Sequence, residues 1–343
     1  MKKLRVLLVT HEDYLPPEDA TEVPKESYMP WKTDFDVRAG LLDLGHDVRM
    51  LGSSGDVTPI RVAIKRFQPD VVFNLLESFH DVPTYDSYVT SYLELLRQPY
   101  TGCNPRGLLL TRDKALSRKI LSYHRIPGPG FAVFPQGRTV RKPAKLRFPL
   151  LVKSLTDDGS VGVAQKSIVH SDEKLAERVA YLHETFATDV IGEEYVVGRE
   201  MYVSVLGNRR LTVLPPIELV FRKLPEGTEP IATSKVKWDL AYQKKVGVDL
   251  VPAEVSEELA GRLQRTTKRI YRALGMSGYG RIDFRVTEED VPIVIEANPN
   301  ADLGYGEELH EAANLAGLKY RDLLQRILNL GMKYEAGWRQ GGV

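Results

Sequence analysis

Two pairs of polar residues near the C-terminal end of the sequence have a spacing that β-structure would bring together. Arg281 and Asp283 are two positions apart, and so are Glu296 and Asn298. Residues two apart in a strand point to the same face, and the acidic turn between the pairs predicts an antiparallel hairpin over about residues 280–297. If Asp283 lies opposite Glu296, Arg281 lies opposite Asn298. Two carboxylates and an amide oxygen suit Mg²⁺ bound together with substrate phosphates, and the guanidinium suits negative charge.

A second motif is the apolar segment LLVK followed by the loop LTDDGSVGV. Lys153 ends a predicted strand over residues 148–153, where a buried amine is costly unless it meets an anion. Gly159, Ser160 and Gly162 would let backbone amides approach phosphate oxygens. The loop lacks the Gly-Lys-Ser/Thr pattern of a P-loop, and a plain glycine turn is the alternative interpretation.

The other candidates are weak when each is taken alone. Glu193, Glu194 and Glu200 border an apolar segment in IGEEYVVGREMYVSVLG and could accept adenine or ribose groups, but a surface strand is the simpler interpretation. Lys114 and Lys237 are isolated lysines, a residue type that is mostly solvated. The hairpin could also be a charged, solvated face. The apolar run at 291–295 argues against that alternative.

The elements that would position these residues alternate between strand and helix in the first hundred positions. Continuous apolar runs predict strands at 4–10, 46–51 and 70–76. Helical periodicity predicts helices at 33–44, 58–67 and 84–97. Such alternation predicts a parallel α/β sheet. HEDYLPPED follows the first strand in place of GxGxxG, which excludes a dinucleotide site. Later helices are predicted at 111–123, 254–274 and 318–330, followed by a frayed tail over about 335–343.

Composition excludes several classes of protein. The 47 basic and 46 acidic residues nearly cancel, so neither nucleic acid nor an anionic membrane is favoured as a partner. The basic segment 135–147 is interpreted as a solvated loop, because a nucleic-acid patch would carry interleaved aromatic residues. The single cysteine, Cys103, excludes an intramolecular disulfide. The apolar run at residues 4–9 is too short for a signal peptide, and we expect a cytoplasmic protein.

The order of the motifs resembles the ATP-grasp superfamily, and within it the D-alanine–D-alanine ligases. The resemblance covers about residues 70–330 and includes PYTG, a helix with Asp113-Lys114, LLVK with its GSVG loop, EEYVVGRE, a Lys-Trp pair and GRIDF…IEANPN. It implies a three-domain α/β ATP-grasp fold with an N-terminal parallel α/β domain. The implied parts are an N-terminal domain (1–103), a central subdomain with the phosphate loop (104–190), a C-terminal subdomain with the metal site (191–333) and a tail (334–343).

The resemblance also implies a role for each candidate residue. The lysines and the loop would bind the phosphates of ATP through Lys114, Lys153, Gly159, Ser160, Gly162 and Lys237. The nucleoside would be bound by Glu193, Glu200 and the backbone of Val196. Two Mg²⁺ ions, or Mn²⁺, would be bound by Asp283, Glu296 and Asn298. Arg281, Lys237 and Ser160 would be the catalytic residues.

The implied reaction is the ATP-dependent ligation of a carboxylate to an amine through an acyl phosphate. Its substrates would be amino acids or peptides, and the first domain would form a homodimer. Two alternatives are a phosphotransferase and a silent ATP-binding module on the same fold. The complete set of phosphate-binding and metal-binding residues argues against the silent module.

The substrate half of the sequence departs from the family. The loop after the first strand is longer than in the family and has no glycine, leaving Glu12 or Asp13 to anchor an amine. The segment LESFHDVPTYDS, which contains His80, replaces a glycine-rich family segment. After the hairpin, Asp302 and Glu307 stand in the segment that holds the substrate carboxylate in the family, and they would repel it. We therefore expect substrates other than two D-alanines, with a preference for a cationic or amine-rich acceptor.

Overall fold

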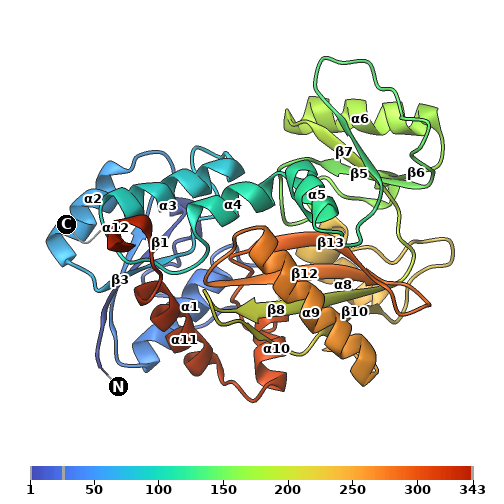
Figure 1. Cartoon of the computed structure of the whole chain (residues 1–343). Coiled ribbons are helices and arrows are strands. Elements are labelled where there is room, and N and C mark those ends of the chain that lie inside the picture. Colours follow the sequence, from blue (N-terminus) through green and yellow to red (C-terminus); the bar gives the residue numbers. More distant parts are fainter. Residues whose placement is uncertain (1, 25–27, 341–343) are drawn as a thin grey trace.

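The computed structural model describes residues 2–24 and 28–340 and contains three separate sheets (Figure 1). The first sheet is parallel, with β1 (Arg5–Thr10) paired between β2 (Asp47–Gly52) and β3 (Val71–Asn74). The chain connects these strands through α1 (Lys32–Asp43) and α2 (Thr58–Phe67). The predicted parallel α/β domain is therefore confirmed. All three strands end at one edge of the sheet.

The second sheet is antiparallel, in the order β4-β7-β5-β6. Its strands are β4 (Phe131–Phe134), β7 (Val190–Glu194), β5 (Leu150–Ser154) and β6 (Ile168–Val169). The amphipathic helix α6 (Asp172–Phe186) covers one face, and its buried leucines and valines share a core with the apolar residues of β5 and β7. This packing leaves the polar ends of β5 and β7 free to line a site.

The third sheet has the order β11-β10-β8-β12-β13, with β9 paired to β8. Its strands are β8 (Arg199–Leu206), β9 (Thr212–Val213), β10 (Ile217–Phe221), β11 (Val248–Pro252), β12 (Tyr279–Val286) and β13 (Pro292–Pro299). The strands β12 and β13 form the predicted hairpin. Its register pairs Asp283 with Glu296 and Arg281 with Asn298, as the spacing predicted. Apolar side chains of α9 (Glu257–Ala273) pack against β8 and β12.

Two helices differ from the sequence-based expectation. The single helix expected over 111–123 is two helices, α4 (Pro105–Arg112) and α5 (Lys114–Tyr123). Asp113 separates them because its backbone is extended and its side chain accepts the amide of Leu116 as an N-cap. The frayed tail is also partly wrong, since Gly337–Gln340 form α12. The rest of that tail, 341–343, lies outside the described residues.

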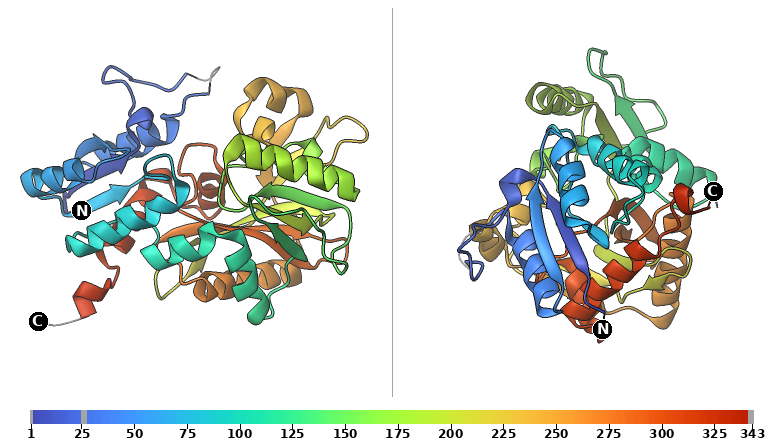
Figure 2. Two further views of the ribbon diagram at one scale, coloured as in Figure 1. Left: turned by 90° about the horizontal axis from the view of Figure 1, so that it is seen from above. Right: turned by 90° about the vertical axis from the view of Figure 1, so that its left-hand side faces the viewer.

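The C-terminal helix α11 (Tyr320–Met332) returns to the first domain. It packs against α1 and β3, and its leucines join the core of the first sheet. Figure 2 shows this red helix beside the blue strands of the N-terminal region. The remaining elements are α3 (Asp86–Leu95), α7 (Ser234–Trp238), α8 (Leu240–Val246), α10 (Glu308–Leu315) and the short turns η1 (Glu12–Tyr14), η2 (Pro83–Tyr85) and η3 (Gln165–Ser167). Within the described parts of the chain, no helix has the length and apolar character needed to cross a bilayer.

Candidate active site

The hairpin of β12 and β13 carries a connected polar cluster. The guanidinium of Arg281 donates to both carboxylate oxygens of Asp283, at 2.7 and 3.0 Å, and to Glu308 Oε2 at 2.7 Å. Asn298 Nδ2 donates to Asp283 Oδ2 at 2.8 Å. The register shifts after Asp283, which marks a bulge at the site and is a common device for aiming side chains near active sites.

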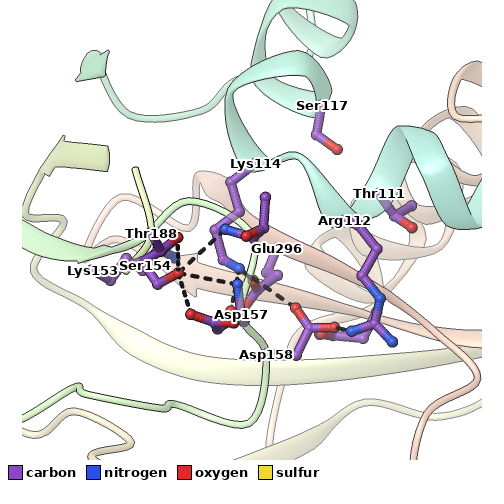
Figure 3. Close-up of polar contacts among 12 residues, drawn as sticks. Thr111, Arg112, Lys114, Ser117, Lys153, Ser154, Asp157, Asp158, Thr188 and Glu296 are labelled. Carbon is purple, nitrogen blue, oxygen red and sulfur yellow. Dashed lines mark hydrogen bonds and ion pairs between the residues drawn. The ribbon is translucent and has the colours of Figure 1, made fainter. Parts of the chain in front are cut away.

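Lys114 faces this hairpin from the start of α5. Its ammonium lies 3.0 Å from Glu296 Oε1 and donates to the carbonyl of Asp157 at 2.6 Å (Figure 3). It also lies 3.5 Å from Asp158 Oδ1. Lys114 is only 6% exposed, so it is not the solvated lysine that its isolation in the sequence would predict.

Lys153 and Glu193 form a second buried ion pair, with 3.1 Å between Nζ and Oε2. Arg118 contacts the other oxygen of Glu193 at 2.6 Å and donates to the carbonyl of Val294 in β13. Arg118 was missed in the sequence, although it lies one helical turn after Lys114 and therefore on the same helix face. It links the second sheet to the hairpin of β12 and β13.

The carboxylates in these pairs are held in their charged form. Burial raises the pKa of Glu193, but Arg118 and Lys153 outweigh it and the net pKa is lowered. Burial also opposes ionisation of Glu296, yet Lys114 and Lys153 bring its pKa to about 2. Glu296 therefore carries the charge that a metal ligand requires.

The predicted phosphate loop lines the same pocket as the Lys114–Glu296 and Lys153–Glu193 pairs. Gly159, Ser160 and Gly162 have positive φ angles of 64°, 59° and 69°, which give the turn a shape that favours glycine. The indole of Trp238 donates to the carbonyl of Gly159 at 3.0 Å. Asp158, which the sequence did not single out, pairs with Arg112 and Lys114. The loop is thus connected to helices α4, α5 and α7.

Lys237 and Glu200 approach from the third sheet and the helix beside it. Lys237 Nζ lies 3.2 Å from Glu308 Oε1, so Glu308 bridges Lys237 and Arg281. Glu200 accepts from Arg285 at 2.6 Å and from the hydroxyl of Tyr202 at 2.7 Å. Glu308 could not be recognised from the sequence, since nothing in its local pattern separates it from a surface glutamate.

Nearly all the predicted site residues line one pocket between the second and third sheets. Its walls include Lys114, Lys153, Gly159, Ser160, Glu193, Val196, Glu200, Lys237, Arg281, Asp283, Glu296 and Asn298. Gly162 is the exception, because its Cα faces Phe186 and Leu182 of α6. The pocket brings the cationic side chains of Lys114, Lys153, Lys237 and Arg281 together with the carboxylates of Asp283 and Glu296 and the amide of Asn298. This combination suits a polyphosphate and a divalent metal.

Metal binding was predicted for Asp283, Glu296 and Asn298. Among the described residues, no group of three or more His, Cys, Asp or Glu side chains could hold a metal ion. Asp283, Glu296 and Asn298 offer two carboxylates and one amide oxygen from one hairpin face. That donor set fits Mg²⁺, which ordinarily takes one or two carboxylates together with substrate phosphates.

The predicted amine anchors in the first domain do not reach this pocket. Glu12 accepts from the hydroxyl of Ser54 at 2.5 Å, and Asp13 is exposed beside His11. His80 has a positive φ of 52° and its ring lies against Phe79. Neither Glu12 nor Asp13 is among the residues that line the pocket.

Comparisons with known proteins agree with the fold and the motifs. Residues 121–329 match the profile of the family described as D-ala D-ala ligase C-terminus. The chain is 30% identical to a D-alanine–D-alanine ligase of Moorella thermoacetica over 316 residues, which cover 90% of this chain and 96% of the relative. It is 31% identical to the Sinorhizobium fredii protein y4sG over 314 residues, covering 88% of this chain and 89% of that one.

A solved structure extends the likeness to the whole fold. The D-alanine–D-alanine ligase of Bacillus anthracis complexed with ATP superposes with a TM-score of 0.72 at 22% identity, covering 96% of this chain and 98% of the other. The chain belongs to the D-alanine–D-alanine ligase family of the ATP-grasp superfamily. Its class is therefore that of ATP-dependent ligases that join a carboxylate to an amine. The family implies ATP and a divalent metal.

Proposed function

We propose that the chain forms an amide bond between an amino acid or peptide carboxylate and an amine, using ATP bound in the pocket between the second and third sheets. The observation that carries this proposal is the convergence of Lys114, Lys153, Lys237 and Arg281 with the metal-binding face of one hairpin. A site that only bound nucleotide would have no need of Arg281 beside the metal ligands.

The proposed reaction has two steps. A carboxylate oxygen of the substrate attacks the γ-phosphorus of ATP, ADP leaves with the electron pair of the broken P–O bond, and an acyl phosphate forms. The amine nitrogen then attacks the acyl carbon, and phosphate leaves. Lys114, Lys153 and Lys237 offset the charge of the phosphates, and Arg281 stabilises the negative charge that develops at the acyl group.

The residues around this chemistry have supporting roles. The loop with Gly159, Ser160 and Gly162 would cover the phosphates and exclude water, which would otherwise hydrolyse the acyl phosphate. Glu193, Glu200 and the backbone of Val196 would hold the nucleoside. Two Mg²⁺ ions, replaceable by Mn²⁺, would be bound by Asp283, Glu296 and Asn298 and would supply positive charge to the phosphates.

The proposal also covers the domain boundaries, the oligomeric state and the location of the protein. We assign residues 1–103 to a substrate-side domain, 104–190 to the central subdomain, 191–333 to the C-terminal subdomain and 334–343 to a tail. We also propose that the protein forms a homodimer through its first domain. We place it in the cytoplasm, where ATP is abundant. Small-molecule amino acids or peptides are the substrates.

The substrates differ from two D-alanines. Asp302 and Glu307 follow the hairpin in the segment where the family holds a substrate carboxylate, and like charges disfavour such a ligand. Glu307 illustrates the effect, since burial together with Asp302 and Glu308 raises its pKa to about 8. Formation of D-alanyl-D-alanine by this protein would contradict this part of the proposal.

The test is release of ADP and phosphate from MgATP with single and paired amino acids and dipeptides, followed by mass spectrometry. A product lighter than the sum of its two components by one water establishes the ligase. A stable phosphorylated product without amide formation would identify a phosphotransferase instead. Asp283→Asn should lose at least about a hundredfold in kcat, whereas Asp290→Asn, in the turn of the same hairpin, should keep wild-type activity.

A further inference from the structure

Thr10 and Asp34 meet at the carboxyl end of the parallel sheet. Thr10 is the last residue of β1, and Asp34 lies in the first turn of α1, after the long loop at residues 11–31. Thr10 is fully buried, and Asp34 is only 4% exposed. Ligands of open parallel sheets bind at this edge, where the strands end.

The carboxylate of Asp34 is buried without a cationic partner. Among the described residues it forms no ion pair, and its Oδ1 has no partner within hydrogen-bond distance. Thr10 is near enough for its hydroxyl to favour the charged form. Buried carboxylates are otherwise paired, because loss of hydration costs several kcal/mol. A cationic group of a ligand would supply the partner that the chain does not.

More carboxylates surround the same place. Thr33, the neighbour of Asp34, donates to Asp302 Oδ1 at 2.6 Å, and Lys32 donates to the carbonyl of Tyr305 at 2.7 Å. These bonds join the start of α1 to the loop that follows the hairpin. Glu77, just after β3, and Asp302 both act electrostatically on Asp34. Within the described residues, neither of them is ion-paired.

Two tyrosines complete the surroundings. The phenol of Tyr14 is influenced by Glu77 and Asp34, and that of Tyr28 by Asp302, Glu77 and Glu307. The ring of Tyr28 also packs edge-on against Trp238, which contacts the phosphate loop, with 5.2 Å between centroids. Carboxylates combined with aromatic faces are the usual recognition elements for organic ammonium groups.

The acidic cluster, defined as Asp34, Glu77, Asp302 and Glu307, adjoins the proposed reaction centre. Glu307 is influenced by the charges of Lys237 and Glu308, which line or border the ATP pocket. Nearby cations are already engaged, as Lys32 pairs with Asp36 at 3.0 Å and Lys237 with Glu308 at 3.2 Å. Among the described residues, Asp34, Glu77 and Asp302 have no ion-pair partner, so the cluster offers acceptors for more than one ammonium group of a ligand.

We propose that the amine substrate carries two ammonium groups on a short aliphatic chain, and that Asp34 binds the one that does not react. This inference rests on the ligase function proposed above and names the class of its acceptor as a diamine or a diamino acid. The second nitrogen gives one proton to the solvent and then attacks the acyl carbon as a free amine. The C–O bond to phosphate breaks, and phosphate leaves with its electron pair and takes up the proton that the nitrogen releases.

The first test is binding by isothermal titration calorimetry, which needs no turnover. Putrescine should bind at least about tenfold more tightly than butylamine, which has the same carbon chain but one amine. Asp34→Asn and Glu77→Gln should each abolish most of this preference. The matched control is Asp47→Asn, the same change at an exposed position at the opposite end of the same sheet. Equal binding of the two amines, or a preference that survives Asp34→Asn, would overturn the inference.

The second test measures ADP release from MgATP. Ornithine and lysine are compared with norvaline and norleucine, which lack the side-chain amine. In a separate comparison, putrescine is added to neutral amino acids. Faster release with the diamino compounds, lost in Asp34→Asn, supports both proposals. Release driven equally well by neutral amino-acid pairs refutes the diamine inference and leaves the ligase standing. Selective putrescine binding without ADP release from any mixture supports the diamine site and counts against the ligase.

Discussion

At the scale of single residues, the site is built from cations and carboxylates that neutralise one another. Lys114 is shared between Glu296 of the hairpin and Asp158 of the phosphate loop. Burial lowers the pKa of Lys114, but these two carboxylates reverse the effect and raise it. Any phosphate that binds Lys114 therefore competes with its present acceptors, which are these two carboxylates and the carbonyl of Asp157.

Replacing Asp158 tests this competition. Asp158→Asn removes a charge that pairs with Arg112 and Lys114. Lys114, which lines the pocket, then keeps Glu296 as its ionic partner and is more available to a phosphate oxygen. We expect the KM for ATP to fall about threefold to tenfold, since charge-assisted hydrogen bonds contribute about 1.5–3 kcal/mol each. The measurement is the initial rate of ADP release against ATP concentration. Asp172→Asn, on the outer helix α6, serves as the control, and a higher KM in Asp158→Asn would show that Asp158 holds the loop in its binding form.

Asp34 makes the stability of the protein depend on pH. Burial raises its pKa from 3.8 to about 7, with a smaller opposing contribution from Thr10. The folded protein thus binds the proton more tightly than the unfolded chain, so this group lowers stability as pH rises from about 4 to about 7. Asp34→Asn should raise Tm by a few degrees above pH 7, because about 1 kcal/mol corresponds to ~2–4 °C in a protein of this size class.

The same variant should show no gain in Tm near pH 4, where Asp34 is protonated in the folded state. Differential scanning calorimetry at pH 4.5 and pH 8 measures both differences. Asp47→Asn provides the exposed reference. An equal change in Tm at the two pH values would mean that the carboxylate is not the source of the effect.

At the scale of elements, the phosphate loop is anchored by a neighbouring helix. Trp238, at the end of α7, donates to the carbonyl of Gly159, and Ser234 at the start of α7 donates to Ser160. These two hydrogen bonds therefore couple the position of the loop to that of α7. Tyr28 packs on the same indole from the long loop of the first domain, so three segments of the chain meet at Trp238.

Trp238→Phe keeps an aromatic ring but removes the hydrogen bond to the loop. We expect more ATP to be hydrolysed without ligation, by about twofold to tenfold, because a looser loop admits water to the acyl phosphate. The ratio of phosphate released to amide formed measures this leak. Trp338→Phe, in the distant helix α12, controls for loss of an indole. An unchanged ratio in Trp238→Phe would show that the bond does not seal the site.

At the scale of the whole molecule, the C-terminal helix holds the first domain against the ATP-binding part of the chain. Gly40 of α1 lies against Leu324 and Tyr320 of α11. Gly331 of α11 lies against the backbone of Tyr100 and Thr101. Both positions have room only for hydrogen. Close packing at these two positions fixes α11 against α1 and against the segment at Tyr100 and Thr101.

Gly331→Ala should destabilise the protein because its methyl group would collide with the carbonyl of Tyr100, which cannot rotate away. Overpacking of this kind costs about 1–3 kcal/mol. Thermal unfolding measures the loss, and Gly337→Ala is the control because its added methyl has nothing within 4 Å. A Tm unchanged in Gly331→Ala would mean that α11 adjusts its position freely.

Local periodicity and spacing in the sequence were enough to predict several features of the fold and of the site. The register that pairs Asp283 with Glu296 followed from the two-residue period of strands and the short turn between them. The parallel order of the first sheet followed from the alternation of strands and helices. The motif order also identified the family, because several motifs in one order are far more specific than any single motif.

Only the tertiary structure decided which distant side chains meet. Arg118 and Glu193 are 75 residues apart and Arg281 and Glu308 are 27 apart, and no local pattern marks either Arg118 or Glu308 as a partner. Nothing in the local sequence distinguishes Asp34 from an exposed helical aspartate, although the fold buries it. Burial and pairing depend on how the three sheets and α11 pack together, and that packing sets the charge surrounding each group.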